Sequence, residues 1–167
     1  MASSDLSLAE KLRSYSTCDV SDALLKVGVP HGGFLPNLSM WSPLRQEGDR
    51  KLIGPAYTVK FVRNTQTNAP KLKEHYVFVR NVGTPSFYEV ARPSEVNVPV
   101  KLQDPALDVT INPGDIIFGD LNGVVCVPKE VISKIVEILP GQVEADDNMA
   151  RDIAQGKTFT AAKKEYR

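Results

Sequence analysis

The side chains able to do chemistry in this 167-residue chain are mainly carboxylates, with only two histidines and two cysteines beside them. Divalent metal ions prefer oxygen ligands, and a bound metal ion can stabilise the negative charge that forms in enolate chemistry. The carboxylates of interest form three groups along the sequence: Asp19 with Asp22, Asp115 with Asp120, and Glu144 with Asp146 and Asp147. These groups are the first candidates for a metal site.

Each group also has a purely structural interpretation, which we favour. Asp19 and Asp22 stand at a predicted helix start, where acidic side chains cap the helix and complement its dipole. Asp115 and Asp120 flank a predicted strand beside tight turns, where aspartate bonds to nearby backbone. The third group lies near the start of a predicted helix, where an exposed acidic face is usual. A metal role therefore needs evidence beyond these residue types.

The histidines and cysteines give weaker indications. His31 and His75 lie in predicted loops, so we favour solvated loop side chains over a catalytic role. Cys18 stands at a predicted helix N-terminus, where the helix field can lower a thiol pKa, but an ordinary buried small residue is the favoured interpretation. Cys126 lies in an apolar run and is expected in the core of a strand. The two cysteines form no metal-type or redox-type pair.

Several functional classes are excluded by what the sequence lacks. It has no phosphate-binding loop, no dinucleotide fingerprint, no Gly-x-Ser-x-Gly elbow and no His-Glu-x-x-His helix. The 20 basic and 20 acidic residues cancel, which argues against nucleic acid or an anionic membrane as the main partner. The N-terminus resembles no signal peptide, and no apolar run approaches the roughly 20 residues that span a bilayer. We expect a soluble, cytoplasmic protein.

The elements that must position these side chains are short. Helices are predicted over residues 7–15, 17–27, 128–139 and 143–155, with a stop at Pro140-Gly141 and a last short helix from Thr158. Strands are predicted over residues 53–62, 96–102, 107–111, 116–118 and 124–127, with a further short one possible at 76–80. Residues 81–95 are a poor candidate for any regular element. This order predicts one α/β sandwich-like domain over residues 1–167.

Local signals mark several ends of these elements. Ser7 and Glu10 have the spacing of a capping box, and Thr17 or Asp19 is expected to cap the second helix. Asn122-Gly123 is a strong hairpin signal between the last two strands.

Four segments, in order, resemble markers of one known family. They are Thr17-Cys18-Asp19-Val20-Ser21-Asp22-Ala23-Leu24, then Gly54-Pro55-Ala56-Tyr57-Thr58-Val59, then residues 92–100, and finally residues 113–128 with Gly119-Asp120-Leu121-Asn122-Gly123-Val124-Val125. The family is that of the RraA-like, metal-dependent 4-hydroxy-4-methyl-2-oxoglutarate aldolases, and the third segment resembles its fungal-type version. One such motif is weak, but four in order are specific, and the resemblance covers about residues 8–167.

The resemblance implies a swivelling α/β/β sandwich that assembles into trimers or hexamers with active sites between subunits. Members cleave 4-hydroxy-4-methyl-2-oxoglutarate, or the related 4-carboxy compound, to pyruvate and another 2-oxo acid, and they decarboxylate oxaloacetate. A magnesium or manganese ion and an arginine stabilise the pyruvate enolate. By its distance from Gly156, Asp146 matches the acidic metal residue of the family's C-terminal helix, with Glu144 or Asp147 less favoured.

The sequence departs from the family pattern at about Tyr76–Val77. The family has there a Gly-rich helix start for the substrate carboxylate, a strand ending in Asp-Gly, and the Arg-Asp pair of the metal site. Arg80-Asn81 is not that pair, because the residues around it resemble the family's segment C-terminal to the pair. We therefore expect an incomplete sandwich that lacks core strands and a helix, and we assign no catalytic or substrate-binding residue.

Two functions stay open at this point. One is a metal-dependent aldolase and oxaloacetate decarboxylase that acts on a small 2-oxo acid. The other is a catalytically inactive relative, either a binding or regulatory protein like the RraA proteins that inhibit a ribonuclease, or a degenerate truncated paralogue. The residues alone favour inactivity, because the sequence does not contain the family's donors that stabilise charge in the transition state.

Overall fold

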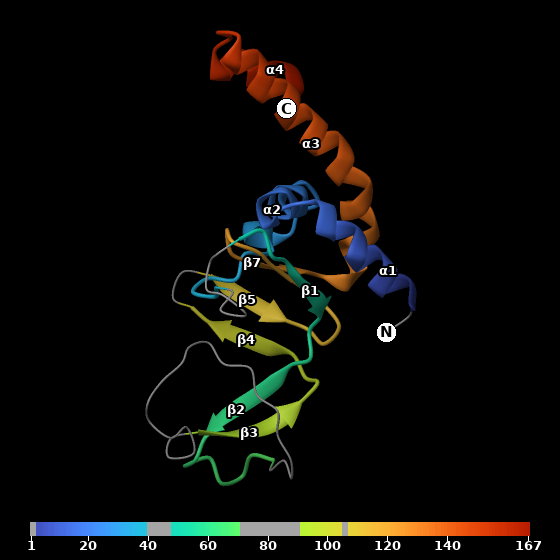
Figure 1. Ribbon diagram of the computed structural model, residues 1–167. Helices are drawn as coiled ribbons and strands as arrows, with labels where there is room; N and C mark the ends of the chain where they lie inside the picture. Colours follow the sequence, from blue (N-terminus) through green and yellow to red (C-terminus); the bar gives the residue numbers. More distant parts are fainter. Residues whose placement is uncertain (1–2, 40–47, 71–90, 105–106) are drawn as a thin grey trace.

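The computed structural model describes residues 3–39, 48–70, 91–104 and 107–167. Small antiparallel sheets and short helices form the body, and the long helix α3 projects from it with α4 folded back beside it (Figure 1). The predicted mixed α/β class is confirmed. Within the described residues, no helix is long and apolar enough to cross a membrane.

The N-terminal helices differ from the prediction in their caps. Helix α1 spans Ser3–Lys11 and continues into a 3-10 turn, Leu12–Ser14, so Ser7 lies inside α1 and does not cap it. Helix α2 spans Thr17–Lys26 and is capped by Ser16. The Asp19 backbone N–H donates to the Ser16 hydroxyl, and the Asp19 carboxylate accepts from the Ser16 backbone N–H at 2.8 Å. Thr17 does not cap α2, because its hydroxyl donates to a distant carboxylate instead.

Seven strands form three antiparallel sheets in the described part of the chain. The main sheet has the order β1 (Leu52–Pro55), β6 (Ile116–Gly119) and β7 (Val124–Val127). The other two are pairs, β2 (Val59–Arg63) with β3 (Ala91–Val96), and β4 (Val100–Gln103) with β5 (Asp108–Ile111). The β6–β7 hairpin confirms the Asn-Gly signal, and the Asp120 N–H donates to the Gly123 carbonyl across its turn.

Two predicted strands are wrong in their extent. The single strand predicted over residues 53–62 is two strands, β1 and β2. The backbone between them bonds to loop residues: the Ala56 N–H donates to the Asp115 carbonyl, and the Thr58 carbonyl accepts from the Asn97 N–H. Residues 96–102 are interrupted at Asn97, whose φ of 55° lies in the left-handed region. The pattern also missed β3, which includes residues 91–95. The possible strand at 76–80 and the departure near residues 76–77 lie outside the described residues.

The predicted stop at Pro140-Gly141 is also wrong. Helix α3 runs without interruption over Ile132–Ala154, after a 3-10 turn at Lys129–Val131. Leu139 before the proline and Gln142 after it are both buried, and the Gln142 side-chain amide donates to the Asp19 carbonyl at 3.0 Å. Packing against α2 therefore continues past Pro140 and outweighs its low helix propensity. Helix α4, Phe159–Tyr166, begins after Thr158 as predicted.

The core lies where α1, α2 and α3 cover one face of the main sheet. Its buried members are Ala9, Leu12, Val20, Ala23, Leu24, Ile116, Phe118, Val125, Val127, Ile132, Ile135 and Leu139. The alternate residues of β7, Val124 and Cys126, face a smaller cluster with Leu35. The 3-10 turn Pro30–Gly33 crosses here so closely that a Cβ on Gly33 would lie 2.2 Å from the Cys126 carbonyl oxygen. The second face of this sheet is thereby covered at β7.

Candidate functional site

Two of the segments that resemble the family markers meet at Asp120. The Thr17 backbone N–H and hydroxyl donate to the two carboxylate oxygens of Asp120, at 2.8 and 2.6 Å. The Asn122 backbone N–H donates to the same carboxylate at 2.8 Å. Only 5% of Asp120 is exposed. The start of α2 is therefore held to the β6–β7 turn through one buried carboxylate.

The environment of Asp120 keeps it ionised. Burial raises the pKa of this carboxyl, but the hydrogen bonds from Thr17 and Asn122 outweigh burial and leave the pKa below its usual value. A carboxylate with these hydrogen bonds is deprotonated at neutral pH and acts only as a hydrogen-bond acceptor. The turn interpretation is thus confirmed for Asp120, with the contact to Thr17 added.

A cleft of about 300 Å³ lies beside this contact, between α2 and the hairpin turn. Its described lining consists of Thr17, Cys18, Ser21, Asp22, Phe34, Asn122, Gly123, Val124 and Val125. Asp22 is the one charged residue among them. Burial, and then the carboxylates of Asp120, Asp19 and Asp22, raise the pKa of the Cys18 thiol. Even with Arg167 paired to Asp22, these three carboxylates outnumber the one described basic group beside the cleft, and this excess of negative charge suits a cation better than a dicarboxylate.

The two cysteines have opposite environments. Cys18 is exposed, and its pKa is raised, so both the expected burial and the alternative of a lowered thiol pKa are wrong. Partial burial of the thiol, and then the three nearby carboxylates, raise this pKa despite the position of Cys18 at the helix start. Cys126 is buried in β7, as predicted, and burial together with Asp115 raises its pKa to about 12.

Two further candidate carboxylates, Asp19 and Asp115, have structural roles, as favoured from the sequence. Asp19 completes the capping box of α2. Asp115 is buried and accepts hydrogen bonds from the backbone N–H groups of Asn112, at 2.8 Å, and Lys129, at 3.3 Å. His31 is exposed in the 3-10 turn with a positive φ of 54°, and His75 lies outside the described residues.

Asp146, the residue that the resemblance assigns to the metal, is paired with an arginine. Arg167 Nε and Nη2 contact the two carboxylate oxygens of Asp146 at 2.8 and 2.7 Å, and Nη2 also contacts Asp22 at 3.0 Å. Glu144 and Asp147 lie on the same helix, α3. In residues 3–39, 48–70, 91–104 and 107–167, no three acidic, histidine or cysteine side chains gather as a metal site would require. In the described structure the Asp146 carboxylate is therefore occupied by Arg167.

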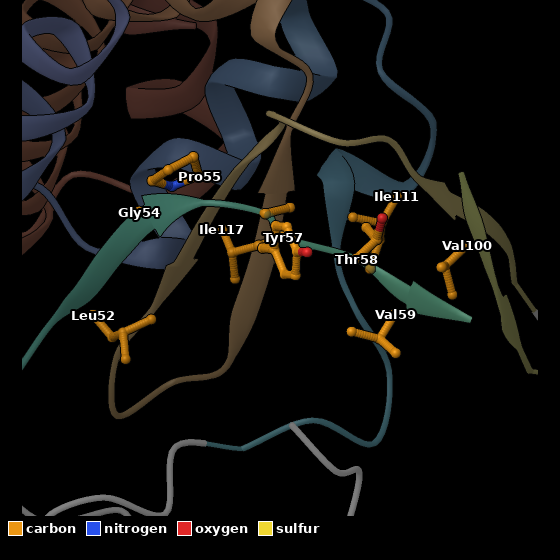
Figure 2. Close-up of a pocket in the computed structure, with 10 residues that line it drawn as sticks. Leu52, Gly54, Pro55, Tyr57, Thr58, Val59, Val100, Ile111 and Ile117 are labelled. Carbon is orange, nitrogen blue, oxygen red and sulfur yellow. The ribbon is translucent and has the colours of Figure 1, made fainter. Parts of the chain in front are cut away.

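A second candidate site is an apolar groove that the sequence did not predict. Its volume is about 380 Å³, and it is lined by Leu52, Gly54, Pro55, Ala56, Tyr57, Thr58, Val59, Val100, Ile111 and Ile117. Figure 2 shows these side chains grouped along the segment from β1 to β2, with Val100 and Ile111 contributed by the β4–β5 pair. None of these described lining residues is charged, and Tyr57 and Leu52 are 63% and 55% exposed. Apolar surface gathered in this way is typical of a contact site.

Comparison with solved structures identifies the fold. An uncharacterized protein from Pseudomonas syringae pv. tomato str. DC3000 superposes with a TM-score of 0.72 over 96% of this chain and 94% of its own, at 19% identity. Streptomyces coelicolor RraAS2, described as an unusual member of the RNase ES inhibitor RraA protein family, superposes with a TM-score of 0.60 over 84% and 95%, at 18% identity. The chain therefore has an RraA-like fold.

Sequence comparison adds one partial relative. The protein DlpA of Legionella pneumophila is 38% identical over 58 residues, which are 35% of this chain. The matched segment spans only 9% of DlpA. No family model matches the chain.

Proposed function

We propose that this chain acts by binding and regulation, as a non-catalytic protein with an RraA-like fold. The observation that carries the proposal is the pairing of Asp146 with Arg167. A guanidinium that bonds both oxygens of a carboxylate makes a strong, directional contact, and its positive charge repels a divalent cation. The family-implied metal ligand is thus already neutralised by this chain's own side chain.

The polar cleft gives further support, because it does not suit the family's substrates. A 2-oxo dicarboxylate needs positive groups or N–H donors that are aimed at its carboxylates and at the forming enolate oxygen. The one charged residue in the described lining is Asp22, and the nearby Asp19 and Asp120 add to its negative potential. Such a cleft binds a small dianion poorly.

The apolar groove supplies the surface for binding. Exposed Tyr57 and Leu52 are side chains of the kind that anchor protein contacts, where a few aromatic and aliphatic residues carry most of the free energy. RraAS2 is described as a member of a family of RNase ES inhibitors, so the partner we propose is a ribonuclease of that type. Self-association into a trimer or hexamer, as the resemblance implies, is part of the same proposal.

A second candidate is the aldolase and oxaloacetate decarboxylase of the family, with magnesium or manganese. It is favoured by the meeting of two family-like segments at the cleft beside Thr17 and Asp120, and by the negative potential there. In this case the substrate is a small 2-oxo acid.

Catalysis is tested with a coupled pyruvate assay on the purified full chain, with oxaloacetate and magnesium. We expect no pyruvate beyond that released by magnesium and heat-denatured chain, and no heat of magnesium binding by calorimetry. A matched chain, with a family-typical segment restored between Tyr76 and Val77, serves as the positive control. Magnesium-dependent turnover by the unmodified chain, equal to that of the restored one, would overturn the proposal.

Binding is tested by titrating the full chain with the catalytic part of an RNase ES-type ribonuclease. Tyr57→Ser should weaken the affinity about tenfold or more, as expected when an anchor residue is lost. Leu25→Ser is the matched control, because Leu25 is 54% exposed on α2 and lies outside the groove. Equal affinities of the two variants, or no binding by the unmodified chain, would contradict a contact through the groove.

A further inference from the structure

Helix α4 is attached to the rest of the fold mainly by polar contacts. Of its residues only Ala162 is buried, and Phe159, one of its two aromatic residues, is 59% exposed. Figure 1 shows α4 lying back along the projecting part of α3. A helix that buries so little apolar surface gains little from the hydrophobic effect, so other contacts must hold it.

The first set of these contacts lies at the turn between α3 and α4. Lys157 Nζ contacts the Asp152 carboxylate at 2.8 Å and also pairs with Glu165. The Tyr166 hydroxyl donates to the same Asp152 carboxylate at 3.0 Å. The hydrogen bonds with Asp152 and Glu165 raise the pKa of Lys157 above its usual value, so this lysine stays charged at any physiological pH. These pairs join α4 only to α3.

The second set reaches across to α2 through one side chain. Arg167 binds Asp146 on α3 and Asp22 on α2, so it bridges the seam between these two helices. Asp22 also lines the cleft of about 300 Å³. The position of α4 is therefore coupled to a charged wall of the cleft.

All of these ion pairs are partly exposed to solvent. The exposed fractions of Arg167, Asp22 and Asp146 side chains are 32%, 43% and 31%. Exposed pairs stabilise a structure by about 0–1 kcal/mol each, and salt screens them. The core between α1, α2, α3 and the main sheet is apolar and is not weakened by salt in this way.

We propose that α4 is a strap held by ion pairs, which detaches as a unit while the core stays folded. When it is docked, Arg167 neutralises Asp22 and Asp146 at the seam of α2 and α3. When it is released, both carboxylates are free and the cleft beside them becomes more negative. The strap thus switches the charge of the cleft, under either candidate function.

Hydrogen exchange of the full chain tests the strap. At about 1 M salt, where the screening length is about 3 Å, amides of residues 159–167 should exchange several-fold faster than at low salt. Amides of residues 132–139, in the core half of α3, should keep their rate. At low salt, Arg167→Gln should speed exchange in residues 159–167 by about fivefold, as the loss of roughly 1 kcal/mol predicts.

Arg13→Gln is the matched control, because Arg13 makes an exposed pair with Glu10 on α1 and has no contact with α4 among those described. It should leave exchange in residues 159–167 unchanged. The strap is disproved if salt or Arg167→Gln leaves these amides unchanged. It is equally disproved if residues 132–139 accelerate with them, because α4 and the core would then open together.

Discussion

Thr17 donates both its backbone N–H and its hydroxyl to the carboxylate of Asp120, across 103 residues of sequence. The contact joins the first turn of α2 to the β6–β7 hairpin, and Thr17 and Asn122 both line the polar cleft beside it. Because Asp120 also closes its own turn through Asn122, it orders the hairpin turn as well as the start of α2.

Replacement of Asp120 by asparagine should destabilise the fold markedly. The substituted amide turns an NH2 group toward a donor of Thr17 or Asn122 and removes the charge that these donors stabilise. We expect the free energy of unfolding to fall by about 2–3 kcal/mol, measured from urea midpoints at an unchanged slope. Thr17→Val, which removes only the hydroxyl, should lower it by about 1 kcal/mol. A change below about 0.5 kcal/mol in the first variant would refute this role.

Asp120 should also contribute to acid unfolding. Its pKa is below the usual value in the folded chain, so the unfolded chain takes up the proton more readily. The resulting stability is fully present above the unfolded-state pKa of about 3.9 and is lost as the pH falls through the lower, folded-state pKa. Asp120→Asn should therefore show a weaker loss of stability below about pH 4 than the native chain. A residual loss should remain, because the pKa of Asp152 is also lowered, chiefly by its hydrogen bond with Lys157. If the free energy of unfolding falls equally below about pH 4 in the native chain and in Asp120→Asn, the prediction is contradicted.

The two thiols should differ sharply in reactivity. Cys18 is exposed with a raised pKa, whereas Cys126 is buried and has a pKa of about 12. In the native chain, alkylation followed by mass spectrometry should modify Cys18 alone, at a rate that still rises above about pH 8.5 because the thiolate is the nucleophile. In denaturant both thiols should react. Modification of Cys126 in the native chain would show that β7 is less protected than the structure indicates.

Pro140→Ala should stabilise the protein. Pro140 is exposed in the middle of α3, and alanine restores the backbone N–H that a helix interior needs. We expect a gain of about 1–3 kcal/mol in the free energy of unfolding, because proline costs about 3 kcal/mol relative to alanine inside a helix. Thermal or urea unfolding measures it. Loss of stability instead would indicate two helices with a stop at Pro140, as the local sequence pattern suggests.

Much of the fold follows from local sequence. The apolar spacing and Gly28 place α2 correctly, Asn122-Gly123 places the β6–β7 hairpin, and Thr158 marks the start of α4. The turn role of Asp120 and the core position of Cys126 also follow from their neighbours. In each case the determining interaction lies within a few residues, so the periodicity of the backbone is enough.

Other features depend on partners far along the chain. Only packing against α2 carries α3 past Pro140, and only the folded chain brings Arg167 to Asp22, 145 residues away, and to Asp146. The groove around Tyr57 likewise needs side chains from β4, β5 and β6. The sequence by itself determined the RraA-like resemblance, the short elements and their turns. The tertiary structure decided the charge state and the neighbours of each candidate site, because long-range contacts leave no periodic signal.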